Sequence, residues 1–119
     1  MGRRDLDYFG ELFAPFGPVT IRRMFSGVGI YAEDVMFAMA IGGAIYLKAD
    51  DHTVASFQQH GSTPFSYATK DGRRSIMSFW RMPDRLYDDP DELAGWAREA
   101  LAAAHRAGAR AKQPRRHRR

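Results

Sequence analysis

The first stretch of the chain carries apolar residues at helical spacing. Between residues 5 and 16 they recur at every third or fourth position, at Leu6, Phe9, Leu12, Phe13 and Phe16. This spacing places them on one face of an α-helix. We expect Asp5 to cap the start of this helix. We expect Pro15, followed by Gly17 and Pro18, to end it, because proline lacks the backbone N–H that a helix interior needs.

The pattern then changes to short runs rich in strand-forming residues, at positions 19–25, 28–32, 35–41 and 44–49. The pairs Glu33-Asp34 and Gly42-Gly43 separate the last three runs, and Ser26-Gly27 separates the first two. Two-residue connections of this kind are typical of hairpins. The runs therefore predict an antiparallel meander of three or four strands.

The run at residues 35–41 is apolar at both its odd and its even positions. A strand with this pattern is typically covered on both faces. If the helices lie on one side of the sheet, a homodimer would cover the other side. The alternative is a central strand whose second face is covered by a helix or loop of the same chain.

A short helix and a hairpin are predicted next. Asp50 or Asp51 is suited to cap the helix, and Gly61 is suited to end it. Residues 65–69 and 75–81 then predict two paired strands around Asp71-Gly72, a dipeptide that favours hairpin turns.

The last helix has the strongest start signal in the chain. Asp89 stands at the N-cap position, Pro90 at the first helical position and Glu92 at the third. We expect Gly108 to end the helix. The apolar stripe between these ends consists of Leu93, Trp96, Ala97, Ala100, Leu101 and Ala104.

These elements predict one α+β domain over residues 1–108, followed by a basic tail over residues 109–119 that we expect to be disordered. The order is helix, three or four strands, helix, two strands, helix. Since nothing in this order requires a parallel crossover, we expect a two-layer fold with helices on an antiparallel sheet. A length of 119 residues agrees with a single domain.

The composition narrows the classes of function. The chain has no cysteine, which excludes disulfides, cysteine metal sites and thiol catalysis. No apolar run reaches the ~18 residues of a membrane span, and the N-terminus lacks the apolar region of a signal peptide. We therefore expect a cytoplasmic protein without a membrane partner.

The net charge of +4 is unevenly distributed. Residues 106–119 carry seven basic and no acidic residues, whereas the rest of the chain carries eleven basic and 14 acidic ones. Clustered cations attract phosphates without sequence preference, so the tail is a candidate for weak, salt-dependent binding of nucleic acid. The alternative is a solvated tail, since it has no aromatic residue for base stacking. The candidate tail residues are Arg110, Lys112, Arg115, Arg116, Arg118 and Arg119.

Motifs for catalysis are missing from the sequence. The four histidines lack metal-ligand spacing, and no nucleophile elbow, P-loop or dinucleotide fingerprint occurs. The acidic residues at positions 88–92 agree with helix capping. We therefore expect no catalytic, metal or cofactor-binding residue, and no enzyme.

Two neighbouring arginines are the most informative polar residues. Arg22 and Arg23 lie in a predicted strand, where neighbours point to opposite faces. Each either pairs with a carboxylate, such as Asp50 or Asp51, or binds an anion or a partner. The candidate partner-binding or anion-binding residues are Arg22, Arg23, Lys48, Tyr67 and Trp80, and a small-ligand cleft near Arg23, Lys48 and Tyr67 is a further alternative.

Several motifs follow one another in a fixed order: Arg22-Arg23-Met24-Phe25-Ser26-Gly27-Val28-Gly29-Ile30-Tyr31, Met36-Phe37-Ala38, Ile45-Tyr46-Leu47-Lys48-Ala49-Asp50, Pro64-Phe65-Ser66-Tyr67, Ser78-Phe79-Trp80-Arg81-Met82-Pro83 and Asp91-Glu92-Leu93-Ala94-Gly95-Trp96-Ala97. In this order and spacing they resemble the N-terminal domain of the TfoX/Sxy competence-regulator family. The resemblance covers roughly residues 5–107. It departs from the family pattern at Ser26, where a glycine is common.

The resemblance implies a secretion-chaperone-like fold. It also implies a regulatory protein, associated with DNA uptake, that acts as a transcriptional co-regulator beside the cyclic-AMP receptor protein and is not an enzyme. The implied partner is therefore a protein, in particular a transcription regulator. Full-length regulators of the family carry a second, helical domain that these 119 residues do not contain.

We therefore expect a non-enzymatic regulatory or protein-interaction domain. Two alternatives remain. One is an accessory protein that binds nucleic acid nonspecifically through its basic tail, and the other is a small-ligand-binding domain.

Overall fold

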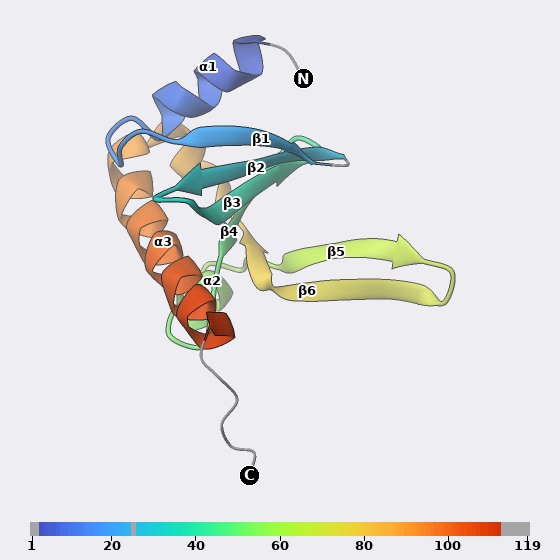
Figure 1. Cartoon of the computed structure of the whole chain (residues 1–119). Helices are drawn as coiled ribbons and strands as arrows, with labels where there is room; N and C mark the ends of the chain where they lie inside the picture. The colour runs from blue at the N-terminus through green and yellow to red at the C-terminus, as the bar shows by residue number, and fades with distance from the viewer. Residues whose placement is uncertain (1–2, 25, 113–119) are drawn as a thin grey trace.

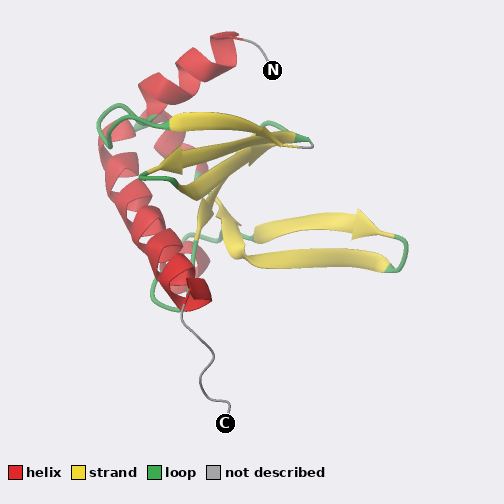
Figure 2. Cartoon of the chain, in the orientation of Figure 1, coloured by secondary structure: helices red, strands yellow, loops and turns green. Residues whose placement is uncertain are grey.

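The computed structural model describes residues 3–24 and 26–112. Its six strands form one antiparallel sheet in the order β1-β2-β3-β4-β6-β5. The helices lie on one side of this sheet, and the β5–β6 hairpin, here called the arm, projects away from them (Figure 1; Figure 2). The predicted α+β class and the order of elements are confirmed. The elements are α1 (Arg3–Leu12), β1 (Thr20–Met24), β2 (Gly27–Ala32), β3 (Val35–Ile41), β4 (Ala44–Lys48), α2 (Val54–Gln59), β5 (Pro64–Thr69), β6 (Gly72–Arg81), the 3-10 helix η1 (Asp84–Asp88) and α3 (Pro90–Lys112).

Two tight turns hold the meander together. Glu33 and Asp34 have φ angles of 51° and 67°, and Gly42 and Gly43 have φ angles of 60° and 81°. Positive φ at both central residues is the mark of a type I′ turn, whose twist matches that of paired strands. The predicted meander over β1 to β4 is therefore confirmed.

The turn of the arm is displaced by one residue from the prediction. Thr69 pairs with Gly72, so the two connecting residues are Lys70 and Asp71. The Thr69 hydroxyl accepts a hydrogen bond from the Asp71 N–H at 3.3 Å and donates one to the Gly72 carbonyl at 3.2 Å. Gly72 is the first residue of β6 and has a φ of 130°, a conformation that L residues rarely adopt and glycine adopts easily.

Two of the predicted caps are wrong. α1 begins at Arg3, so Asp5 lies inside the helix instead of at its start. Arginine is a good helix former, which allows the helix to start before the aspartate. α2 begins after Thr53, and the Asp50 carboxylate instead accepts hydrogen bonds from Arg106 of α3 and from the N–H of His52. Asp50 therefore ties two elements together, and neither it nor Asp51 caps the helix.

The end of α2 agrees with the prediction. Gly61 has a φ of 72°, in the left-handed region that favours glycine. Its N–H donates to the Gln58 carbonyl, and the Ser62 N–H donates to the Phe57 carbonyl, both at 3.0 Å. These two bonds form a Schellman motif, which satisfies the last carbonyls of the helix.

The start of α3 is confirmed and its end is not. The Glu92 N–H donates to the Asp89 carboxylate at 3.2 Å, as an N-cap requires. The helix continues through Gly108 to Lys112. A glycine inside a helix costs only about 1 kcal/mol, which does not stop a helix that is packed along the sheet. Residues 113–119 of the basic tail lie outside the described part of the chain.

The core lies between the sheet and the helices. The cross-strand row Ile30, Ala38, Leu47 and Trp80 faces α3, and each of these residues is at most 4% exposed. The buried stripe of α3 packs against this face and includes Leu93, Ala97, Ala100 and Ala104. This burial is the main stabilising term of the two-layer fold.

A bulge in β3 alters the predicted alternation of its side chains. Ile30 pairs with Ala38, but its neighbour Tyr31 pairs with Met36, so Phe37 is an additional residue. The Phe37 ring is fully buried and packs against Phe13 at 5.5 Å. Odd and even positions of β3 therefore do not mark two faces along the whole strand, because the bulge exchanges them.

Candidate functional site

A row of cross-strand neighbours runs over the side of the sheet that faces away from the helices. Arg22 pairs with Gly29, and Gly29 pairs with Met39. Met39 pairs with Tyr46, and Tyr46 pairs with Arg81. Paired residues of neighbouring strands point to the same face, so these five residues share one face of the sheet. The row crosses five strands and has an exposed arginine at each end.

Soft apolar side chains surround the glycine of this row. A Cβ on Gly29 would lie 2.7 Å from Met36 Sδ, 3.0 Å from Tyr31 Cε1 and 3.2 Å from Met24 Sδ. These three side chains therefore converge above the glycine. The guanidinium of Arg22 lies 4.5 Å from the centre of the Tyr31 ring, in a cation–π contact.

The arm continues the same face. The Phe65 ring meets Tyr46 edge-on at 5.1 Å and stacks with Tyr67 at 6.2 Å. The register pairs Phe65 with Ile76 and Tyr67 with Arg74, which adds these side chains to the face. Tyr67 is 42% exposed and Ile76 is 37% exposed. We call this surface the open face, and its residues are Arg22, Met24, Gly29, Tyr31, Met36, Met39, Tyr46, Phe65, Tyr67, Arg74, Ile76 and Arg81.

The charges of the sheet are of one sign. The six strands contain six basic residues and no acidic one. All 14 carboxylates of the chain therefore belong to its turns, loops and helices. Of the six cations, the exposed arginines at positions 22, 74 and 81 belong to the open face. These exposed arginines give the open face a positive charge, and no strand carries a carboxylate that would balance it.

The predicted partner-binding residues are separated by the fold. Arg22 and Tyr67 lie on the open face. Arg23 pairs with Val28, which is fully buried on the helical side, so Arg23 points away from the open face. Trp80 is 4% exposed, and its indole N–H donates to the Met77 carbonyl at 2.8 Å. A partner cannot reach the Trp80 side chain, because it is enclosed between its neighbour Leu47 on β4 and Phe57 of α2.

The predicted small-ligand cleft is not formed by its three residues. Arg23 lies on β1 and Tyr67 on β5, and these strands are opposite edges of the sheet. Lys48 lies on β4, with its ammonium 5.0 Å from the centre of the Phe79 ring. The structure therefore does not bring the three together.

Asp50 has a partner on the helical side. Arg106 donates from Nε to Oδ2 at 2.7 Å and from Nη2 to Oδ1 at 3.0 Å. This bidentate bond lowers the pKa of the Asp50 carboxyl. The aspartate thus fastens the end of β4 to α3, in place of the predicted pairing with an arginine of β1.

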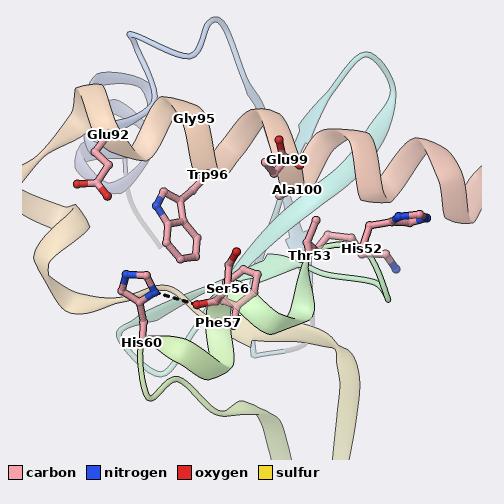
Figure 3. Close-up of a pocket in the computed structure, with 11 residues that line it drawn as sticks. His52, Thr53, Ser56, Phe57, His60, Glu92, Gly95, Trp96, Glu99 and Ala100 are labelled. Atoms are coloured by element: carbon pink, nitrogen blue, oxygen red, sulfur yellow. Dashed lines mark hydrogen bonds between the residues drawn. The ribbon is translucent and has the colours of Figure 1, made fainter.

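A pocket of about 400 Å³ lies between α2 and α3 (Figure 3). Its aromatic wall is formed by the Trp96 ring, which meets Phe57 and His60 edge-on at 5.1 Å each. At one end, Arg85 donates hydrogen bonds to both carboxylate oxygens of Glu92 and to His60 Nε2, the last at 3.3 Å. The same arginine lowers the pKa of the Glu92 carboxyl.

The polar groups that line this pocket do not favour one charge of ligand. His60 Nδ1 lies 2.8 Å from the Ser56 carbonyl, and its Nε2 lies 3.3 Å from the Arg85 guanidinium, so both ring nitrogens already have protein partners. The lining contains Glu99 as well as Lys48, so it presents both signs of charge. In the described part of the chain, no three His, Asp or Glu side chains are grouped so that they could hold a metal ion.

The predicted tail site is only partly described. Arg110 and Lys112 belong to the last turns of α3. The positions of Arg115, Arg116, Arg118 and Arg119 lie outside the described residues. Of the helices in the described ranges, none has the length and apolar character needed to cross a membrane.

Sequence reasoning missed most of the open face. Met24, Met36, Met39, Arg74 and Arg81 were not candidates, because their shared face depends on the register of strands that are distant in sequence. One signal was available in the sequence. The predicted strands contain basic residues and no acid, and this imbalance indicates a sheet whose charges are all positive.

Comparison with known proteins places this fold in a family. Residues 11–104 match the TfoX N-terminal domain. The chain is 26% identical to Protein Sxy of Escherichia coli (strain K12) over 94 residues, which are 79% of this chain and 44% of that protein. It is also 26% identical to the DNA transformation protein TfoX1 of Aliivibrio fischeri (strain ATCC 700601 / ES114) over 101 residues, which are 82% of this chain and 48% of that protein. The chain thus spans about half the length of these relatives, and it belongs to the TfoX N-terminal domain family.

Proposed function

We propose that this chain is a non-enzymatic, cytoplasmic regulatory domain that acts by binding a protein partner through the open face. Membership of the TfoX N-terminal domain family supports a regulatory role. One of the matched relatives is named for DNA transformation, and we propose a transcription regulator as the class of partner.

The observation that carries this proposal is the composition of the open face. Arg22, Arg74 and Arg81 are exposed on it, while Met24 and Met36 are half-buried there. Methionine is flexible and polarisable, and surfaces rich in it adapt to the side chains of a partner. A surface that combines such apolar groups with unopposed cations favours recognition of another macromolecule over chemistry on a small substrate.

The binding of nucleic acid by the tail stays a prediction. Removing residues 113–119 while keeping α3 complete separates that activity from the open face. A truncation at Gly108 would also remove the last turn of α3, so the cut belongs after Lys112.

Complementation in the native host tests the proposal. Cells that lack the chain receive the wild type, the Arg22→Glu/Arg81→Glu variant, or the Arg73→Glu variant, a control that reverses one exposed arginine outside the open face. Arg73 is exposed on the opposite face of the arm, where it donates to the Ser66 hydroxyl at 3.0 Å. We expect the double variant to give the transcript profile of the deletion and the control to restore the wild-type profile. Full complementation by the double variant would contradict the proposed surface.

A further inference from the structure

We infer that the open face binds an acidic amphipathic α-helix of the partner protein, an inference that rests on the proposed function. The first argument is the distribution of charge along the row from Arg22 to Arg81. Four strand spacings of ~4.8 Å separate its ends, or roughly 19 Å along the sheet. A helix with its side chains is about 10–12 Å wide, so it fits between the two arginines.

The cations stand at both margins of this space. Arg22 lies at one edge strand and Arg81 lies on β6 at the other side, while Arg74 lies farther along β6, toward the turn of the arm. Carboxylates on the two flanks of a bound helix would therefore each meet a guanidinium. Since no strand carries an acidic residue, the strands of the open face offer a basic helix no carboxylate.

The middle of the row suits apolar side chains. Met39 is buried at its centre, and its cross-strand neighbour Tyr46 is half-buried. The Met24 and Met36 side chains can move to admit a partner's leucine or phenylalanine. The apolar stripe of an amphipathic helix, with residues at every third or fourth position, would lie against these side chains, with the helix axis running between the two arginines.

The aromatic rings of the open face already contact an arginine or one another, which disfavours a nucleic acid as the occupant. The Tyr31 ring is covered by Arg22, and Phe65 is stacked with Tyr67 and meets Tyr46 edge-on. Binding of single strands depends on aromatic faces that are free to stack with bases. A helix needs no such face.

A second copy of this chain is also disfavoured as the occupant. Two open faces that meet would bring the arginines of both copies together, at positions 22, 74 and 81. Like charges at an interface oppose association. The predicted homodimer is therefore not proposed through this surface.

A synthetic peptide tests the inference on the full chain. The probe is a fluorescein-labelled peptide of about 18 residues, with Glu on its polar face and Leu and Phe at positions i, i+3, i+4 and i+7. Fluorescence anisotropy should show saturable binding that weakens severalfold when salt rises from about 0.05 M to about 0.5 M. A peptide with Lys in place of every Glu should not bind.

Charge reversal locates the site. Reversing Arg22, Arg74 and Arg81 together to Glu should weaken binding at least about tenfold, the effect of losing three exposed ion pairs. Arg73→Glu makes the same charge change as Arg74→Glu at the neighbouring position of β6, but on the other face of the arm. It should leave affinity within about twofold. Equal losses in Arg74→Glu and Arg73→Glu would show a net-charge effect and overturn the inference. Circular dichroism checks the fold of each variant, and single Arg→Gln variants keep the test decisive if the triple variant unfolds.

Two other results would overturn the inference. A single-stranded oligothymidylate that binds through the same arginines more tightly than the peptide would identify a nucleic-acid surface. A peptide that fails to bind would exclude the acidic helix. In that last case the proposed function survives if the Arg22→Glu/Arg81→Glu variant still fails to complement, so the two failures are distinguishable.

Discussion

Trp80 and Tyr67 are both predicted to contact a partner, but the structure places Trp80 in the core and Tyr67 on the surface. Trp80 is 4% exposed and packs against Phe57 at 6.2 Å, whereas Tyr67 is 42% exposed on the arm. A buried tryptophan removes about 200 Å² from water, which at ~25 cal/mol per Å² gives an upper limit of about 5 kcal/mol. Truncations of this kind measured in other proteins cost about 3–5 kcal/mol. We therefore expect Trp80→Ala to lower the free energy of unfolding by about 4 kcal/mol.

Urea unfolding followed by circular dichroism measures this loss. A decrease of this size corresponds to roughly 15 °C in melting temperature for a domain of this length. Tyr67→Ala should cost no more than about 1 kcal/mol, because it removes mainly a partly exposed stacking contact with Phe65. It should instead weaken binding of the acidic peptide. A loss below about 1 kcal/mol in Trp80→Ala, with an unchanged denaturant slope, would refute the assignment of this residue to the core.

Three further predictions concern the fold. Gly27→Ala would place a Cβ 2.0 Å from the Ala40 carbonyl oxygen, so we expect a loss of about 2 kcal/mol or more in urea unfolding; wild-type stability would contradict this packing. The pKa of Asp50 is lowered by Arg106, so its contribution to stability is present above its unfolded pKa of about 4 and is lost as pH falls through the folded value. Thermal melts should show the difference between wild type and Asp50→Asn shrinking below about pH 4, and a constant difference would exclude this role. Asp89→Ala should cost about 1 kcal/mol in thermal melts through loss of the N-cap, and an unchanged melting temperature would exclude a capping role.

The parts of the fold that depend on local chemistry were predictable from the sequence. The turns at Glu33-Asp34 and Gly42-Gly43, the cap at Asp89 and the helix end at Gly61 each follow from the conformations that single residues favour. The caps at Asp5 and Asp50 could not be predicted correctly. In the second case the carboxylate is engaged by Arg106, which lies 56 residues away.

The candidate site was less predictable because it is built from long-range register. The bulge at Phe37 changes which residues of β3 share a face, and no local sequence pattern predicts this bulge. The pairing of β4 with β6 brings Arg81 beside Tyr46, although α2 and β5 separate the two strands in the sequence. The burial of Trp80 follows from the same pairing, since it places the indole in the row that faces α3.

Mapping the bound peptide by nuclear magnetic resonance tests the central claim most directly. Amide signals of the ¹⁵N-labelled chain of 119 residues are followed during titration with the acidic amphipathic peptide. We predict that the shifts concentrate in β1, β3, β4 and the arm, and include Arg22, Met39, Tyr46 and Arg81. Shifts confined to the pocket between α2 and α3, or to residues 106–119, would contradict the open face as the binding surface.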